Sequence, residues 1–424
     1  MDASSPTATS TSAVAVTTAG LRGAYWNESR LPVGTALTVH ALRTDDGAVV
    51  TGYLFRRGGE RTVVCAMHPR ELLVPQYLVP EVLRAGCAMW VQGPRSVGND
   101  IRLEHEAAII DLAAGQSFLE QAGFTQRVLV GLSGGGPLAA FYIQQAKLRP
   151  EARLTRSPAG RPTGLGKTRM PVPSGVILLS AHLGQGPLLL RCIDPSVTDE
   201  QAPLSIDESI SAFSAANGFK RPPESARYSA EFVRAYRDAQ LRRVERIEAA
   251  ARKIVDMRAE ARRRTKEAPS QADAIVTAHT PIFNVWRTDA DLRCFDLSLD
   301  PSERAYGSLW GPTPIVSNYG SVGFARVCTA DSWLSNWSAI SSNATMAKCA
   351  PSIQQPCLMI EFTGDNGVFP SESDELFGLL PGPDKERCKI HGNHHGQAVL
   401  PKKPDGQIEA GRAIAEWLGR KQLT

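Results

Sequence analysis

Apolar and polar positions alternate along this chain in a way that changes period from segment to segment. Short, continuously apolar runs are typical of strands buried on both faces. They cover residues 61–67, 87–92, 127–132 and 175–181. Helical periodicity is predicted between them, over residues 75–85, 103–122 and 135–145. Strands that alternate with helices predict a mostly parallel sheet with helices on both faces.

The segments before and after this alternation extend the same sheet. Residues 36–43 and 48–55 are strand-like and are joined by the turn at 44–47, which predicts a hairpin. Late in the chain, residues 356–362 and 387–390 again predict strands, and residues 408–418 predict a closing helix.

Between residues 185 and 300 the alternation stops, and the sequence becomes polar and helical. Over residues 226–263 apolar positions recur every three or four residues, which predicts one long helix or a bent pair. Arginine crowds the other face, which we interpret as solvated. A helix of this length would extend beyond a compact domain, so we consider a homo-oligomer in which part of it packs on another subunit. We interpret residues 185–300 as an inserted lid.

These patterns predict the following organisation of the chain. The fold class is α/β, with a central sheet interrupted by the lid. The expected parts are a disordered tail at 1–22, a first core segment at 23–184, the lid at 185–300 and a second core segment at 301–424.

Composition narrows the class of protein further. The chain is 42% hydrophobic and 21% charged, as in ordinary globular proteins, and a net charge of +4 gives no support for nucleic-acid binding. No apolar run approaches the ~20 residues of a membrane span, and the N-terminal residues lack the pattern of a signal peptide. The eight cysteines form no Cys-x-x-Cys pair, so neither zinc nor a disulfide framework is indicated. We expect a cytoplasmic protein without a metal or cofactor.

The first candidate for chemistry is the sequence Gly131-Leu132-Ser133-Gly134-Gly135, which fits Gly-x-Ser-x-Gly. It lies between a predicted buried strand and a predicted helix, as a nucleophile elbow requires. A serine on such a turn has a strained backbone, and side chains on either flank would clash. The alternative is a glycine-rich turn whose serine only caps the helix.

An activated serine needs a base, and the base needs an orienting carboxylate. Asp365 follows the strand at 356–362, and the pair His394-His395 follows the strand at 387–390. The carboxyl ends of parallel strands meet at one edge of a sheet, so we expect these groups to converge on Ser133. The chain order Ser, Asp, His is that of α/β-hydrolases.

The chain resembles the α/β-hydrolase superfamily over residues 35–184 and 300–420. Four pieces carry the resemblance: Met67-His68-Pro69-Arg70, Gly131–Gly135, Gly364-Asp365-x-x-Val368 and Gly392-Asn393-His394-His395. Together they are specific for the fold and for a serine triad, but not for a substrate.

The resemblance implies a role for each matching residue. Ser133 is the nucleophile, Asp365 the orienting acid and His395 the base, with His394 as its rival. Gly134 supplies one oxyanion amide.

The second oxyanion amide usually follows a His-Gly pair, which here is His68-Pro69. Proline has no N–H, so Arg70 becomes the candidate for the second donor. We expect His68 to brace this loop. His182, near the lid, is interpreted as an ordinary structural or surface residue.

The predicted function is that of a serine hydrolase acting on a small-molecule carboxylic ester or lactone through an acyl-enzyme. Amides and the C–C bonds of β-diketones or ring-cleavage products would use the same constellation. An acyltransferase and a non-catalytic binding protein on the same scaffold are the alternatives from other classes.

Overall fold

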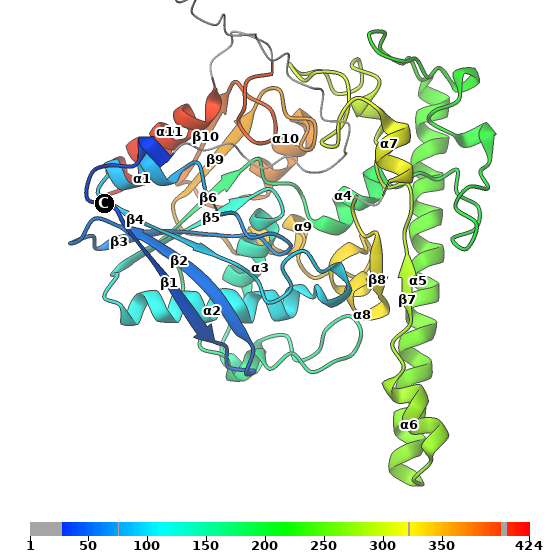
Figure 1. Cartoon of the computed structure of the whole chain (residues 1–424), viewed down its shortest axis with the longest axis horizontal. Coiled ribbons are helices and arrows are strands. Elements are labelled where there is room, and N and C mark those ends of the chain that lie inside the picture. Colours follow the sequence, from blue (N-terminus) through cyan, green and yellow to red (C-terminus); the bar gives the residue numbers. More distant parts are fainter. Residues whose placement is uncertain (1–27, 75, 321–322, 400–404) are drawn as a thin grey trace, which may run out of the picture.

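The computed structural model describes residues 28–74, 76–320, 323–399 and 405–424, so the tail expected at 1–22 lies outside the described residues. Within these ranges the main sheet has eight strands in the order β1-β2-β4-β3-β5-β6-β9-β10 (Figure 1). The strands are β1 (Ala36–Arg43), β2 (Val49–Arg56), β3 (Thr62–Met67), β4 (Ala88–Gln92), β5 (Gln126–Leu132), β6 (Gly175–Leu179), β9 (Cys357–Phe362) and β10 (Lys385–Ile390).

The sheet is antiparallel at one end and parallel elsewhere. β1 pairs antiparallel with β2, and β2 pairs antiparallel with β4. All the remaining neighbours pair in parallel. The hairpin and the buried strands predicted from the sequence are therefore confirmed, with bounds that differ by one or two residues.

Helices cover both faces of the sheet. One face carries α2 (His105–Gln121), α3 (Gly135–Lys147), α9 (Met346–Cys349) and α10 (Pro370–Leu379), and the other carries α1 (Val79–Arg84) and α11 (Gly406–Arg420). In β3, Val63 and Cys65 face the first group of helices, while Val64 and Ala66 face the second. This period of two, with apolar residues on both sides, is the reason that the strands read as continuous apolar runs.

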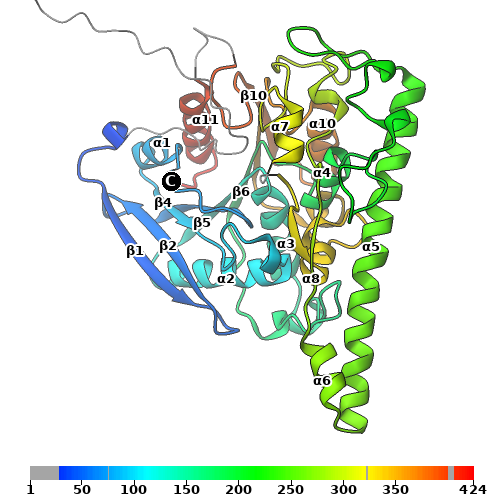
Figure 2. The ribbon, with the colours of Figure 1, turned by 45° about the vertical axis from the view of Figure 1, so that its right-hand side comes forward.

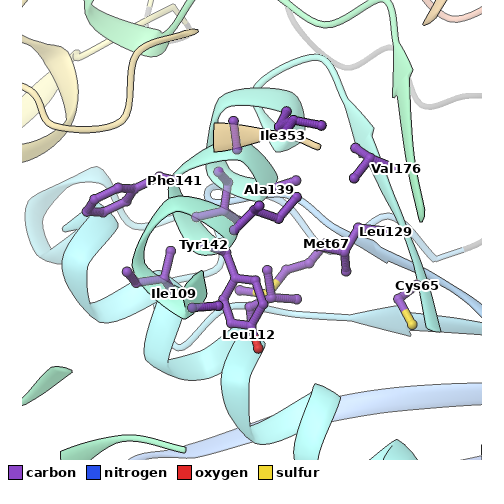
Figure 3. Packing of buried hydrophobic residues seen from close by; sticks show 14 of the residues in the cluster. Cys65, Met67, Ile109, Leu112, Leu129, Ala139, Phe141, Tyr142, Val176 and Ile353 are labelled. Atoms are coloured by element: carbon purple, nitrogen blue, oxygen red, sulfur yellow. The ribbon is translucent and has the colours of Figure 1, made fainter. Parts of the chain in front are cut away.

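The larger of the two cores lies under α2 and α3. Figure 3 shows Ile109 and Leu112 of α2 and Tyr142 of α3 close to Met67 of the sheet. The Tyr142 hydroxyl donates a hydrogen bond to the Pro171 carbonyl (2.8 Å), so its polar group is satisfied inside the core.

Between the neighbouring strands β6 and β9 the chain leaves the sheet. This segment, residues 180–356, holds a two-stranded sheet and helices in addition to α9. They are α4 (Gln185–Cys192), α5 (Ala230–Glu267), α6 (Gln271–Ala278), β7 (Ile282–Asn284), α7 (Pro314–Tyr319), β8 (Val327–Thr329) and α8 (Ala330–Ser332).

Helix α5 is one continuous helix of 38 residues, which settles the choice between one helix and a bent pair. The Ser229 hydroxyl caps its start by accepting a hydrogen bond from the Phe232 amide (3.1 Å). Its predicted stripe is buried at Tyr236, Val244 and Ile247. Figures 1 and 2 show α5 running along one side of the molecule, and its C-terminal part, with α6, projecting beyond the body.

Candidate active site

Ser133 stands at the turn between β5 and α3 with φ +52°, a backbone conformation that non-glycine residues rarely adopt. The turn is held by hydrogen bonds from the Ser133 amide to the Leu179 carbonyl and from the Gly136 amide to the Ser133 carbonyl (both 3.0 Å). The strained serine predicted from the Gly-x-Ser-x-Gly pattern is thus present in the structure.

The glycines of the elbow are required by close packing. A Cβ atom at Gly131 would lie 2.5 Å from the Gly136 Cα, and one at Gly135 would lie 2.7 Å from the Met67 carbonyl oxygen. A Cβ atom at Gly136 would lie 2.4 Å from the Ala181 Cβ. The turn can therefore form only because these positions have no side chain, and it packs directly on the ends of β3 and β6.

Asp365 and His394 form a buried pair at the same edge of the sheet. The His394 Nδ1 atom lies 2.9 Å from each carboxylate oxygen of Asp365. The carboxylate also accepts hydrogen bonds from the amides of Gly367 (2.7 Å) and Val368 (3.0 Å). These contacts fix the carboxylate and turn the other nitrogen of His394, Nε2, away from it.

The structure favours His394 over His395 as the partner of Asp365. The two histidines are adjacent in sequence, and their rings lie 5.2 Å apart edge to face. The His395 amide donates to Asn393 Oδ1 (2.9 Å), and its carbonyl accepts from Gln407 Nε2 (2.9 Å). The sequence pattern placed His395 first as the base and His394 as its rival; in the structure it is the His394 ring that contacts Asp365.

The charge on Asp365 affects the protonation of His394. Burial opposes a charged imidazole, but the carboxylate outweighs this effect and raises the pKa of His394 above its ordinary value. Such a histidine can accept a proton from a nearby hydroxyl and is stabilised in its protonated form. In the described residues no hydrogen bond joins the Ser133 hydroxyl to His394, and catalytic hydrogen bonds are often long before substrate binds.

Arg70 does not present its amide to the pocket as the sequence suggested. Its backbone N–H donates to the Nδ1 atom of His68 (3.2 Å) within the same loop. Its guanidinium makes two hydrogen bonds to the Asp100 carboxylate (2.7 and 2.8 Å) and lies 5.0 Å from the Trp337 ring centre. His68 braces this loop, as expected, because its ring accepts the hydrogen bond of the Arg70 amide.

Ser133 opens into a cavity of about 200 Å³. One wall comes from the core and includes His68, Tyr77 and His394, with the apolar side chains Leu72, Leu73 and Val74. The segment 180–356 contributes the side chains of His182, Gln185, Leu188, Leu309, Trp310 and Phe324 to the lining. The cavity is thus apolar over much of its surface, with polar groups gathered around the serine, as is usual for small-molecule sites.

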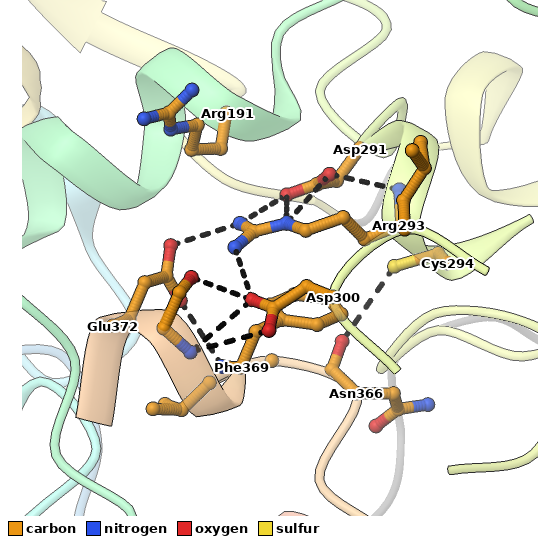
Figure 4. A network of polar contacts seen from close by, with 12 residues as sticks. Arg191, Asp291, Arg293, Cys294, Asp300, Asn366, Phe369 and Glu372 are labelled. Atoms are coloured by element: carbon orange, nitrogen blue, oxygen red, sulfur yellow. Dashed lines mark hydrogen bonds and ion pairs between the residues drawn. The ribbon is translucent and has the colours of Figure 1, made fainter. Parts of the chain in front are cut away.

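A network of ion pairs holds the Asp365 loop against the segment 180–356 (Figure 4). Arg293 pairs with Asp291 (2.7 Å) and with Glu372 of α10 (2.8 Å), and its guanidinium lies 3.8 Å above the Phe369 ring centre. The Cys294 thiol lies 3.6 Å from the Asn366 carbonyl oxygen, next to Asp365. Burial would raise the pKa of Asp291, but Arg293 and Arg237 outweigh it and hold that pKa far below its usual range.

Two kinds of feature are absent from the described residues. No group of three or more His, Cys, Asp or Glu side chains within these residues is placed to hold a metal ion. Among the helices of the same residues, none combines the length and the apolar character that crossing a bilayer demands.

The sheet order, the elbow after the fifth strand and the acid and histidine after the last two strands define the α/β-hydrolase fold. No protein family model matches the sequence, and no curated protein matches it either.

Solved structures with a distant likeness to the chain do exist. The chain is similar to DcsB, solved in complex with its substrate analogue, with 12% identity, a TM-score of 0.46 and coverage of 91% of this chain and 99% of that one. It is similar to the α/β hydrolase GrgF from Penicillium sp. sh18 (11% identity, TM-score 0.46, coverage of 91% and 98%). It is also similar to the Pyrococcus furiosus esterase PF2001 (11% identity, TM-score 0.43, coverage of 95% and 97%). Likeness this distant says nothing of activity, so function has to be argued from the site.

Two pocket residues were not found by sequence reasoning. His182 follows β6 and is buried in the wall of the cavity, although its sequence suggested only a structural or surface residue. Gln185, the first residue of α4, lies near His182 and belongs to no recognisable sequence motif. The one available signal was position, because both follow the carboxyl end of the strand next to the elbow strand.

Proposed function

We propose that this protein is a serine hydrolase that cleaves a small carboxylic ester or lactone through an acyl-enzyme on Ser133. The observation that carries the proposal is the convergence, at one cavity, of a strained serine and a buried histidine held by a carboxylate. The three residues come from the ends of the parallel strands β5, β9 and β10, which meet at one edge of the sheet.

We propose the following role for each of the three residues. The Ser133 hydroxyl attacks the carbonyl carbon, and His394 Nε2 takes its proton while Asp365 orients the ring and stabilises the imidazolium. His394 then returns the proton to the leaving alkoxide. Water activated by the same histidine attacks the acyl-enzyme, and Ser133 is regenerated.

The size of the cavity supports a compact substrate. Sites for drug-sized ligands measure roughly 300–1,000 Å³, whereas this cavity measures about 200 Å³. The apolar side chains around it favour an uncharged acyl group with few polar atoms.

We further propose that the segment at 185–300 acts as a lid, together with the residues that follow it. Leu188 of this segment lines the cavity, as do Leu309, Trp310 and Phe324 farther along the chain. Such a cover would exclude water from the acyl-enzyme and exclude polymeric substrates.

The test is the intact mass of the protein after exposure to a fluorophosphonate, for the wild type and for Ser133→Ala. We expect a single adduct on the wild type that is lost in the variant, followed by turnover of short p-nitrophenyl esters and lactones. A well-folded wild type that neither forms an adduct nor hydrolyses any of these compounds would contradict the proposal. Products are also compared with and without an added alcohol or amine acceptor. The free acid indicates hydrolysis, whereas the acylated acceptor indicates acyl transfer.

A further inference from the structure

Three side-chain nitrogen atoms surround Gly134, the residue after the nucleophile. Measured from the position that a Cβ atom on Gly134 would occupy, His68 Nε2 lies at 2.8 Å, Gln185 Nε2 at 3.0 Å and His182 Nε2 at 3.2 Å. All three side chains line the same cavity as Ser133. Any side chain at position 134 would collide with them, so glycine leaves this small polar space open.

The protonation of His68 is set by its neighbours. Its Nδ1 atom accepts the hydrogen bond from the Arg70 amide (3.2 Å), so the proton of the neutral ring must be on Nε2. Burial, reinforced by the positive charge of Arg70, lowers the pKa of His68 to about 3. At neutral pH this residue is therefore an uncharged ring that points an N–H group at the space beside Gly134.

His182, which follows β6 on the other side of the elbow strand β5, repeats the same arrangement. Its Nδ1 atom accepts a hydrogen bond from the Gly184 amide (3.1 Å), which again leaves the proton on Nε2. Burial lowers the pKa of His182 well below its ordinary value, and proximity to His68 and His394 adds to this effect. Two neutral histidines thus direct N–H groups at the same space.

Gln185 provides the third nitrogen. Its side-chain Nε2 atom is buried and has no hydrogen-bond partner among the described residues. A buried amide N–H without a partner costs roughly 1–3 kcal/mol, so this group calls for an explanation. Here the unused donor lies beside two others, in a cavity that a ligand oxygen can enter.

We propose that His68, His182 and Gln185 form a side-chain oxyanion hole, with the Gly134 amide, in this enzyme. The inference rests on the proposed function, because it assigns the groups that receive the negative charge in that reaction. It also explains the departure at His68-Pro69: proline has no N–H, and the Arg70 amide is engaged by His68.

The step that these groups stabilise is the attack of Ser133 on the carbonyl. The Oγ–C bond forms, the hydroxyl proton moves to His394, and the π electron pair of the carbonyl moves to its oxygen. That oxygen, now negative, accepts hydrogen bonds from the side-chain N–H groups, none of which gives up its proton. When the intermediate collapses, the carbonyl re-forms and the leaving group departs with the proton from His394.

Paired substitutions test the proposal. Glutamine places an N–H group near the position of a histidine Nε2, whereas leucine does not, so we compare His68→Gln with His68→Leu and His182→Gln with His182→Leu. Gln185→Glu replaces the amide by a carboxylate of the same shape. His105→Gln is the matched control, because His105 is a buried histidine with a pKa lowered to about 4 by burial but does not line the cavity.

Each variant is assayed for hydrolysis of p-nitrophenyl acetate, for the affinity of a short-chain trifluoromethyl ketone and for melting temperature. Loss of one oxyanion donor lowers kcat by about 10²–10³-fold. We expect this loss for the leucine variants and for Gln185→Glu, with KM changed only a few-fold and the ketone bound more weakly by a similar factor. The glutamine variants should recover much of the loss, and the control should retain wild-type kinetics.

Two outcomes overturn the inference while leaving the proposed function intact. One is an active wild type whose leucine and glutamate variants bind the ketone as tightly as it does. The other is a loss of activity that follows the melting temperature and is equal in the leucine, glutamine and control variants. A wild type that neither hydrolyses the ester nor reacts with a fluorophosphonate refutes the proposed function itself.

Discussion

The elbow region and the segment 180–356 reach the same cavity, but different forces hold them in place. The turn that carries Ser133 is packed through short contacts of Gly131, Gly135 and Gly136 with backbone and apolar atoms at the strand ends. In the segment 180–356, buried arginines and carboxylates make the connections. Arg287 and Asp194 pair at 2.5 Å with almost no exposure of either side chain, and Arg243 pairs with Glu200 at 2.7 Å.

The difference shows that close packing fixes one region of this protein and paired charges fix the other. The sheet edge is fixed by the shape of its turn, which tolerates no added atom. The segment over it is fixed by charges that are costly to bury singly and tolerable only in pairs. We therefore expect the two regions to respond differently to substitution.

The largest effect on stability should come from breaking the buried pair in the segment 180–356. Arg287→Met leaves the Asp194 carboxylate buried without its cation, which should lower the free energy of unfolding by about 3–5 kcal/mol. Chemical denaturation measures this change. The double variant Asp194→Asn with Arg287→Met should recover part of the loss, and a single variant as stable as the wild type would contradict the prediction.

The second effect concerns the shape of the elbow. Gly131→Ala places a Cβ atom 2.5 Å from the Gly136 Cα, so the turn must shift. We expect a loss of about 1–3 kcal/mol in the free energy of unfolding, by overpacking, and loss of the fluorophosphonate adduct on Ser133. Denaturation and intact mass measure the two results, and full labelling at wild-type stability would show that the turn can relax.

The third prediction concerns the pH dependence of kcat/KM, which a substitution near His394 should change and a substitution in the segment 180–356 should not. Asp365 raises the pKa of His394, so the base is protonated and inactive below that pKa and becomes active as pH rises through it. We expect kcat/KM to fall about tenfold for each pH unit below a midpoint that lies above the ordinary histidine value of about 6.5. Asp365→Asn should move this midpoint to lower pH. Arg287→Met should leave it unchanged, because Arg287 belongs to a different network of ion pairs.

The smallest effect should come from a glycine that no neighbour constrains. Gly419, near the end of α11, has ordinary backbone angles and open space where a Cβ atom would lie. Gly419→Ala should raise the free energy of unfolding by about 0.4–1 kcal/mol, because alanine restricts the unfolded chain. Thermal denaturation tests this, and a loss of stability would mean that the packing around α11 is tighter than the structure shows.

Much of the core was predictable because its signals are local. Continuous apolar runs at 61–67 and 175–181 correspond to β3 and β6 with errors of one or two residues at their ends, since a strand buried on both faces has apolar residues throughout. The stripe on α5 likewise predicted its buried face, because positions three and four residues apart lie on one side of a helix.

The site was predictable only in part. The positions of Ser133 and Asp365 follow from their places at strand ends, which a parallel sheet brings to one edge. The choice between His394 and His395 depends on one hydrogen bond across 29 residues, and adjacent residues in a loop carry no periodic signal to separate them. The proposed oxyanion donors His182 and Gln185 follow β6 but belong to no sequence motif. Only the structure, in which they pack beside Gly134, identifies them.

The sequence by itself therefore determined the fold class, the elbow and the position of Asp365 at a strand end, because local apolar periodicity and strand-end position are properties of short segments. Tertiary structure decided which histidine faces Asp365 and which side chains surround Gly134. These outcomes depend on contacts between segments tens of residues apart, such as Asp365 with His394 and Gly134 with His68 and His182. Such contacts form only when the whole chain has packed, because the partner of a buried polar group is set by the segment that packs next to it.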